Sequence, residues 1–284
     1  NTRKPGERTH MIYIISDVHG NLQRYKKLMK KAVAASGKIP GEGDIVLVLG
    51  DLFAASGSTA PEELIKREMQ LFGYISQQKY ELASVRGNHD KPKRLYSWHA
   101  YPEEKYGNDV ISINNNISFL SDGKTYNIPC GKNKTVKILA LGGALTHALR
   151  FQQRKDLPTV TRYRATYNNL IHATTMTEVD YVAAHDCPAS KMGVLGILFG
   201  KNDLNKLLDK INDNIKQRRW FYGHHHTDND SNGKYHCIYN RVITIDDNGI
   251  DSISKNMVEN DKKRIENKEK LNAQKKKASD ALKG

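Results

Sequence analysis

Carboxylate, amide and imidazole side chains follow several short apolar runs of this chain, and their chemical types suit divalent metal ions. The residues at these positions are Asp17, His19, Asp51, Asn88, His89, His185, His224 and His226. Carboxylates and imidazoles with an amide oxygen favour borderline ions such as Mn²⁺, Zn²⁺ or Fe over calcium. No cysteine enters the pattern, which argues against a thiolate zinc site. Because the candidate ligands exceed what one four-coordinate ion needs, two ions that share a carboxylate fit better.

Four of these residues form two pairs, and the members of each pair are two positions apart. Asp17 and His19 are two apart, and so are His224 and His226. In extended backbone, residues two apart point to the same side. We therefore expect each pair to face the same point, with His225 turned elsewhere and not a ligand.

The elements that position these residues follow from the apolar runs. We expect strands over 11–15, 45–49, 80–85, 181–184 and 220–222, and helices over 22–35, 61–78 and 203–216. Strand, polar tip and helix in alternation are typical of an open α/β sheet, whose sites lie beyond the carboxyl ends of the strands. The five strands therefore predict a shared site at their tips.

The remaining segments consist of further short strands and one basic segment. Short strands are expected over 110–113, 117–120, 124–128, 136–141, 235–239 and 242–245, because turn residues separate these runs. Residues 146–166 are basic, and we expect a loop-rich segment that leads into a helix ending near residue 177. The chain divides into an N-terminal extension or expression remnant (1–10), a main domain (11–254) and a Lys-rich polar tail (255–284).

The positive charge is unevenly distributed along the chain. The formal net charge is +14; the tail contributes +5 (ten Lys/Arg against five Asp/Glu) and residues 1–10 contribute +2, which leaves +7 for residues 11–254. A basic surface of this kind could attract nucleic acid or another polyanion. The alternative is a solvated surface around a site for phosphate. For the tail we expect a solvated segment with some helical tendency, with a polyanion-binding arm as the alternative.

Cysteine usage and hydropathy indicate a cytoplasmic protein. Cys130, Cys187 and Cys237 are odd in number and widely spaced, which argues against a disulfide framework. No apolar run approaches the roughly 18 residues of a membrane span, so no membrane partner is expected.

Five motifs in order carry a family resemblance. They are Asp17-x-His19, Gly50-Asp51, Gly87-Asn88-His89-Asp90, His185 and Gly223-His224-x-His226. This set resembles that of the calcineurin-like metallophosphoesterases and spans residues 17–226. The resemblance implies a four-layer α/β/β/α sandwich of two mixed sheets with a two-metal site. The ions would be Mn²⁺ by preference, with Fe, Zn or Ni as alternatives.

The resemblance also implies a role for each motif residue. One ion would be held by Asp17, His19, Asp51 and His226, and the other by Asp51, Asn88, His185 and His224. A hydroxide that bridges the two ions would attack phosphorus in line. His89 would protonate the leaving oxygen, Asp90 would orient His89, and Arg86 would neutralise the phosphoryl oxygens. The alternative for Arg86 is an ordinary surface ion pair.

Departures from the family pattern bear on the substrate. Ser/Thr protein phosphatases of this superfamily continue the second motif as Gly-Asp-x-x-Asp-Arg-Gly. This chain reads Gly50-Asp51-Leu52-Phe53-Ala54-Ala55-Ser56, so it lacks that arginine. It looks more like the generic members found in bacteria and phages, with an open site.

Three functions remain in order of preference. The first is a metal-dependent phosphomonoesterase acting on a nucleotide, a protein or a small molecule. The second is a phosphodiesterase or nuclease, favoured by the basic surface. The third is a nucleic-acid-binding module without catalysis, supported by the Lys-rich tail alone.

Overall fold

The computed structural model describes residues 10–53, 62–90, 99–131, 134–145 and 153–254, without the side chains of residues 153–159. The chain divides into two units, Asn1–Gly249 and Ile250–Gly284. Only residues 250–254 of the second unit are described. The predicted tail and nearly all of the predicted extension lie outside the described residues, so the division at residues 10 and 254 stays a prediction. No helix in the described part of the chain has the length and apolar character needed to cross a membrane.

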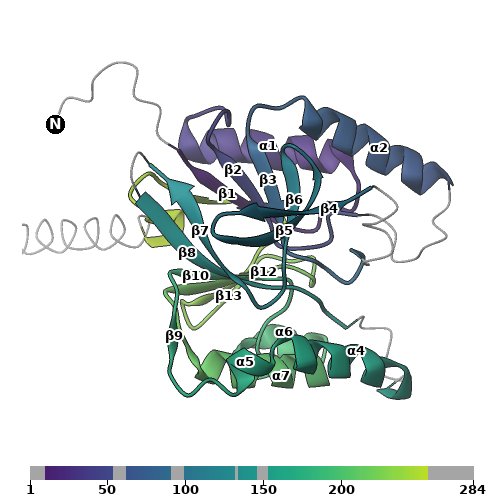
Figure 1. Cartoon of the computed structure of the whole chain (residues 1–284), viewed down its shortest axis with the longest axis vertical. Coiled ribbons are helices and arrows are strands. Elements are labelled where there is room, and N and C mark those ends of the chain that lie inside the picture. Colours follow the sequence, from purple (N-terminus) through teal and green to yellow (C-terminus); the bar gives the residue numbers. More distant parts are fainter. Residues whose placement is uncertain (1–9, 54–61, 91–98, 132–133, 146–152, 255–284) are drawn as a thin grey trace, which may run out of the picture. The chain divides into compact units, whose positions relative to one another are not determined.

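One sheet of seven strands carries the N-terminal part of the chain, and its strands lie in the order β15-β1-β2-β3-β6-β5-β4 (Figure 1). The strands are β1 (Ile12–Ile15), β2 (Ile45–Val48), β3 (Glu81–Ser84), β4 (Tyr101–Lys105), β5 (Asn108–Asn114), β6 (Ile117–Leu120) and β15 (Ile243–Ile245). Pairing is parallel among β1, β2, β3 and β6, and antiparallel for β15 with β1 and for β5 with both neighbours. The sheet is therefore mixed.

A second mixed sheet has six strands in the order β13-β14-β12-β10-β8-β7. The strands are β7 (Thr125–Cys130), β8 (Lys134–Leu141), β10 (Tyr181–Ala184), β12 (Arg219–Tyr222), β13 (Asn229–Ser231) and β14 (Tyr235–Cys237). The inner four pair in parallel, and β7 and β13 close the edges in antiparallel. A short parallel pair, β9 (Thr177–Glu178) and β11 (Ile215–Lys216), lies apart from both sheets.

Helices cover the outer face of each sheet (Figure 1). Helices α1 (Leu22–Ser36) and α2 (Glu62–Ser76) pack on the seven-stranded sheet, in a core that includes Tyr13, Tyr25 and Leu71. On the six-stranded sheet lie α4 (Gln153–Thr166), α5 (Asn168–Ile171), the 3₁₀ turn η2 (Ala189–Lys191), α6 (Val194–Leu198) and α7 (Asp203–Asp213). Each sheet thus has a helical layer of its own.

The other face of each sheet is buried as well. In β1, Tyr13 and Ile15 face the helices, yet Ile12 and Ile14, which alternate with them, are also fully buried. Strands buried on both faces are continuous apolar runs, as β1 and β2 are. The two sheets lie face to face (Figure 1). The predicted four-layer α/β/β/α sandwich of two mixed sheets is confirmed.

Local signals explain where the main helices begin. Asn21 caps α1 by accepting the backbone N–H of Arg24 at 3.0 Å, and Gly37 ends that helix in the left-handed conformation. Asn202 and Asn205 form a reciprocal capping box at the start of α7. Both helices begin within two residues of the predicted positions.

The expected loop-rich segment over 146–166 is wrong in its second part, because α4 is helical from Gln153. The helix expected to end near residue 177 ends at 171, and residues 177–178 form β9. The segment is basic and contains Pro158, so its local pattern does not favour a helix. Tertiary packing supplies the stability instead, since Val160, Tyr163 and Tyr167 recur at helical spacing and are buried.

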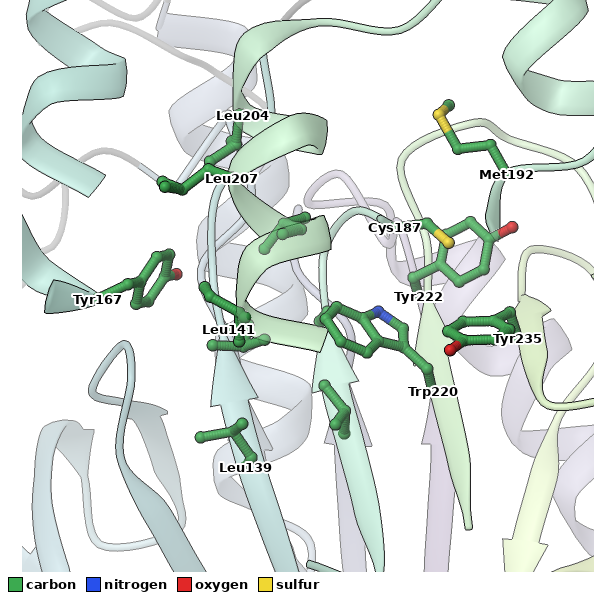
Figure 2. Close-up of a cluster of buried hydrophobic side chains, with 14 of the residues drawn as sticks. Leu139, Leu141, Tyr167, Cys187, Met192, Leu204, Leu207, Trp220, Tyr222 and Tyr235 are labelled. Atoms are coloured by element: carbon green, nitrogen blue, oxygen red, sulfur yellow. The ribbon is translucent and has the colours of Figure 1, made fainter. Parts of the chain in front are cut away.

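The apolar cluster between α7 and the six-stranded sheet supports the strand tips of that sheet (Figure 2). Leu204 and Leu207 of α7 are buried in this cluster together with Leu139 and Trp220 from the strands. The indole N–H of Trp220 donates to the carbonyl of Asp186 at 3.1 Å. Asp186 lies two residues beyond the end of β10, next to His185, so the core fixes the strand tip as well as the strand.

We expect Leu207→Ala to lower the free energy of unfolding by about 2–5 kcal/mol, because it removes buried methyl groups and leaves a cavity. Lys210→Ala on the exposed face of the same helix should change it by about 0.5 kcal/mol or less. Urea unfolding followed by circular dichroism measures both variants. Equal effects at the two positions would contradict the described packing of α7.

Candidate metal centre

The predicted ligands come together from the tips of β1, β2, β3, β10 and β12. Three groups have their ligand atoms within 4.8 Å of one another: Asp17, His19 and His226; His19, Asp51 and His89; and Asp51, His185 and His224. The groups share His19 and Asp51, so they form one continuous centre. Both sheets contribute to it, and residues as distant as 17 and 226 meet there.

Asp51 lies in the middle of this centre. Its Oδ2 atom is 3.3 Å from Nε2 of His185, 3.8 Å from Nε2 of His19 and 3.9 Å from Nε2 of His89. Its Oδ1 atom accepts the backbone N–H of His89 at 2.8 Å. One oxygen is therefore anchored to the chain while the other faces three imidazoles, the arrangement that a shared carboxylate needs.

On one side of Asp51, three side chains converge on a single point. Nε2 of His226 lies 2.9 Å from Nε2 of His19 and 3.5 Å from Oδ1 of Asp17. Ligand atoms about 2.1 Å from one ion lie about 3.0–3.5 Å from each other. The spacing and the oxygen–nitrogen donor set fit one divalent ion bound by these residues with Asp51.

On the other side, two histidines each bond a backbone carbonyl through one ring nitrogen. Nδ1 of His185 lies 2.7 Å from the oxygen of Leu49, and Nε2 of His224 lies 3.2 Å from the oxygen of Leu145. Metal-ligating histidines commonly donate the N–H of their other nitrogen in this way, which fixes the tautomer. Nε2 of His185 then faces Oδ1 of Asn88 at 3.1 Å, and His224 would bind an ion through Nδ1. This side fits a second ion.

Five of the predicted ligands have backbone conformations that L-residues rarely adopt. Asp17, His19, Asp51, His224 and His226 all have φ between 50° and 69°. Each residue in this conformation costs about 1–3 kcal/mol of conformational free energy, and the conformation persists where the surrounding structure holds it. The predicted pairs do converge, but the assumption of extended backbone was wrong. Left-handed turns, not strand alternation, aim these side chains.

Charges within the centre oppose the effect of burial on the pKa values of Asp51, Asp17 and His185. Burial alone would raise the pKa of Asp51, yet the charge and hydrogen bond of His185 lower it. The pKa of Asp17 is also lowered, against burial, by its hydrogen bond with His226 and the charge of His185. Burial lowers the pKa of His19 to about 4, so this ring is neutral at pH 7 and suited to ligation. For His185, burial is outweighed by the carboxylate of Asp51, which raises the pKa to about 10. A metal ion would displace that proton.

A glycine is required at position 87 because the backbone there lies close to Asp51. A Cβ atom at this position would lie 2.0 Å from Oδ1 of Asp51. The φ of Gly87 is not in the left-handed region, so close approach and not backbone conformation requires the glycine. The missing side chain lets the tip of β3 lie against Asp51.

His89 lies at the rim of the centre, with its side chain 30% exposed and its ring edge-on to His19 at 4.9 Å between centroids. Asp90 is buried behind it and accepts the backbone N–H groups of Gly87 at 2.8 Å and Phe53 at 2.9 Å. Burial, and then the charge of Asp51, raise the pKa of Asp90 to about 7. Asp90 thus ties the β2 tip to the β3 tip, and its predicted action on His89 stays a prediction.

Arg86 forms an ion pair with Asp122, a residue that the sequence indicated only as part of a turn. The Asp122 carboxylate raises the pKa of Arg86 against the effect of burial. The alternative stated for Arg86 was a surface ion pair; an ion pair is present, but it is largely buried, with 17% exposure for Arg86 and 2% for Asp122. Guanidinium has five N–H donors, so this pair leaves room for a phosphoryl contact, which stays a prediction.

A buried pair behind the ligands was missed at the sequence level. His225 turns away from the centre, and its Nε2 lies 3.1 Å from Oδ1 of Asp186, with both side chains fully buried. The hydrogen bond and charge of His225 hold the pKa of Asp186 well below its usual range, although burial opposes this. The pair joins the loop of His185 to the loop of His224. Its only sequence signal is the position of each residue beside a predicted ligand.

Comparison with known proteins agrees with this geometry. The model of one protein family, described as calcineurin-like phosphoesterase, matches residues 10–228. The match covers most of the chain and includes every predicted ligand. A search of the curated proteins finds no match.

We expect Gly87→Ala to weaken metal binding by about tenfold or more, because the new methyl group displaces Asp51. The matched control is Gly73→Ala on α2, where a Cβ atom meets nothing within 4 Å. Metal content per chain after equilibrium dialysis against Mn²⁺ measures the effect. Full loading of the Gly87→Ala protein at limiting Mn²⁺ would contradict the expected displacement of Asp51.

We expect Asp186→Asn to lower the free energy of unfolding at pH 7 by about 2–3 kcal/mol, since it removes a charged hydrogen-bond partner. The pKa of this carboxyl group is lower in the folded protein than in the unfolded chain. Its contribution is therefore complete above about pH 4 and is lost as the pH falls below that value. The difference between wild type and variant should shrink toward pH 3 in urea titrations, whereas the exposed Asp213→Asn control should show little difference at either pH. A difference that stays the same from pH 7 to pH 3 would exclude the charge as its cause.

Proposed function

The chain belongs to the calcineurin-like phosphoesterase family, and we propose that it is a phosphatase that uses two divalent ions, Mn²⁺ by preference, to hydrolyse phosphomonoesters. The observation that carries this proposal is the position of Asp51. Its Oδ2 atom lies 3.8 Å from Nε2 of His19 on one side and 3.3 Å from Nε2 of His185 on the other. A carboxylate between two clusters of nitrogen ligands supports a shared, dinuclear site, with Fe, Zn or Ni as alternative metals.

The residues around Asp51 divide into two sets of ligands. We assign Asp17, His19 and His226 to one ion and Asn88, His185 and His224 to the other, with Asp51 common to both. A pair of divalent ions in such a site lowers the pKa of water and offsets negative charge on a phosphoryl group. The left-handed turns at five of these residues support a centre whose ligands are held in place before any ion binds.

His89 is the residue that we assign to proton transfer. It lies beside Asp51, with Nε2 3.9 Å from Oδ2, and its half-buried ring opens to solvent at the rim. In that position it can donate a proton to the leaving oxygen of a bound ester. General-acid assistance of this kind is worth about 10²–10⁴-fold in rate.

Arg86 is assigned to phosphate binding. Asp122 holds one side of the guanidinium, and the Arg86 side chain retains 17% exposure. The backbone carbonyl of Arg86 also accepts the N–H of Gly143 at 2.6 Å, which fixes the β3 tip against the β8 tip. A guanidinium positioned by a carboxylate can neutralise phosphoryl oxygens without moving.

The substrate is a phosphate ester, and its class is a nucleotide, a protein or a small molecule. The absence of the second-motif arginine argues against a typical Ser/Thr protein phosphatase. The cysteines of the chain are all free and buried, which supports a reducing compartment such as the cytoplasm.

A phosphodiesterase or nuclease is the second candidate, and helix α1 favours it. This helix carries five basic residues and no acidic one, namely Arg24, Lys26, Lys27, Lys30 and Lys31. It begins three residues after His19, and its Lys27, Lys30 and Lys31 side chains are exposed. Such a surface could bind the backbone of a nucleic acid. The Lys-rich tail, which is the support for a non-catalytic nucleic-acid-binding module, lies outside the described residues.

We expect hydrolysis of p-nitrophenyl phosphate that requires Mn²⁺ or a similar ion and is lost in Asp51→Asn. His89→Ala should lower kcat by about 10²–10⁴-fold while metal content stays unchanged, because His89 is assigned to proton transfer and not to ligation. The loss should be larger for phenyl phosphate, whose poorer leaving group needs the proton more.

The rival functions give different results in the same assays. Faster turnover of bis-p-nitrophenyl phosphate or of a labelled oligonucleotide would favour the diesterase. No metal uptake and no turnover with Mn²⁺, Fe²⁺, Zn²⁺ or Ni²⁺ would refute the proposed function. Loss of metal in His89→Ala would reassign His89 as a ligand.

A further inference from the structure

His226 is the most exposed of the predicted histidine ligands. Its side chain is 49% exposed, against 23% for His19 and none for His185. An exposed side chain has rotamer freedom that it must lose when it binds an ion. Something outside the ligand set must therefore hold the ring if the site is to be ready for an ion.

Tyr239 provides a surface for that ring. The rings of His226 and Tyr239 are stacked, with centroids 4.9 Å apart and an angle of 13° between planes. The loop of Tyr239 is joined to the loop of His226 through Asp228, whose Oδ1 accepts the backbone N–H groups of Tyr239 at 2.8 Å and Asn240 at 3.0 Å. The stacked partner is thus fixed to the same loop as the ligand.

Arg24 joins this stack to the opposite side of the site. Its guanidinium carbon lies 3.8 Å from the centroid of the Tyr239 ring. Its Nε donates to the carbonyl of Asp17 at 2.6 Å, and Nη2 donates to the carbonyls of Ser16 at 3.2 Å and Tyr239 at 2.9 Å. One planar side chain therefore ties the β1 tip, which carries Asp17 and His19, to the loop that supports His226.

We propose that Arg24 and Tyr239 are positioning residues of the metal centre, which hold His226 in the orientation that completes an ion site with Asp17 and His19. This inference rests on the proposed function, because it concerns one of the two proposed ion sites. Neither residue touches an ion. Tyr239 restrains the ring, and Arg24 sets the distance between the two loops that supply the ligands.

The two proposed ion sites differ in what holds their histidines, and this difference makes the inference specific. The rings of the histidines on the other side of Asp51, His185 and His224, are held instead by the backbone carbonyls of Leu49 and Leu145. Loss of the stack should therefore weaken one ion and spare the other. A general loss of stability would weaken both.

The test is Mn²⁺ binding to the full chain, followed by the electron paramagnetic resonance signal of free Mn²⁺. Wild type should take up two ions. Tyr239→Leu should weaken one of them by about 10–100-fold and leave the other unchanged. Tyr239→Phe should bind both as wild type does, because it keeps the ring. Arg24→Gln should resemble Tyr239→Leu.

The matched control is Tyr74→Leu. Tyr74 also contacts a cation on α1, with Nζ of Lys26 lying 4.7 Å from its ring centroid, but it packs between α1 and α2. Tyr74→Leu should leave both binding constants unchanged. Urea unfolding of each metal-free variant detects any general loss of stability.

Several outcomes would overturn the inference while leaving the proposed function intact. Unchanged binding of both ions by Tyr239→Leu would do so, as would equal weakening of both ions together with the free energy of unfolding. An equal loss in Tyr239→Phe and Tyr239→Leu would show that ring stacking is not the cause. Failure of wild type to bind any ion would instead refute the proposed function itself.

Discussion

The structure depends on a buried carboxylate that would be unfavourable without its neighbours. Asp51 is 2% exposed, and several kcal/mol are needed to bury one ionised carboxylate without compensation. The proton on His185 and the backbone N–H of His89 provide that compensation. Each of these groups lies on a different loop. The charge of Asp51 thus gives distant loops a common point of attachment, and against the effect of burial it raises the pKa of His185.

The two sheets make this convergence possible. Parallel strands bring β1, β2 and β3 to one edge of the first sheet and β10 and β12 to one edge of the second. Left-handed turns at the tips aim the side chains, and the glycine at position 87 lets loops approach within contact distance. Buried pairs then join the loops from behind: Asp90 to the β2 tip, and Asp186 to His225. The site is held from several directions before any ion arrives.

Sequence reasoning was able to find the strands and their tips, because short runs such as Ile12–Ile15 are buried on both faces and carry an unbroken apolar signal. It failed where stability comes from tertiary packing, as in α4, whose basic composition hides the buried Val160 and Tyr163. It also missed the supporting pairs. Arg86 and Asp122 are 36 positions apart and Arg24 and Tyr239 are 215 apart, so no local pattern links them. The convergence of Asp17 with His19 was predicted, but from strand alternation, whereas left-handed turns produce it.

Anomalous diffraction from crystals loaded with Mn²⁺ measures whether two ions share Asp51. A shared carboxylate should give two anomalous peaks about 3.5–4 Å apart, each about 2.0–2.4 Å from an oxygen of Asp51. One peak should lie among Asp17, His19 and His226, and the other among Asn88, His185 and His224. A single peak, or two peaks of which only one contacts Asp51, would contradict the sharing of Asp51.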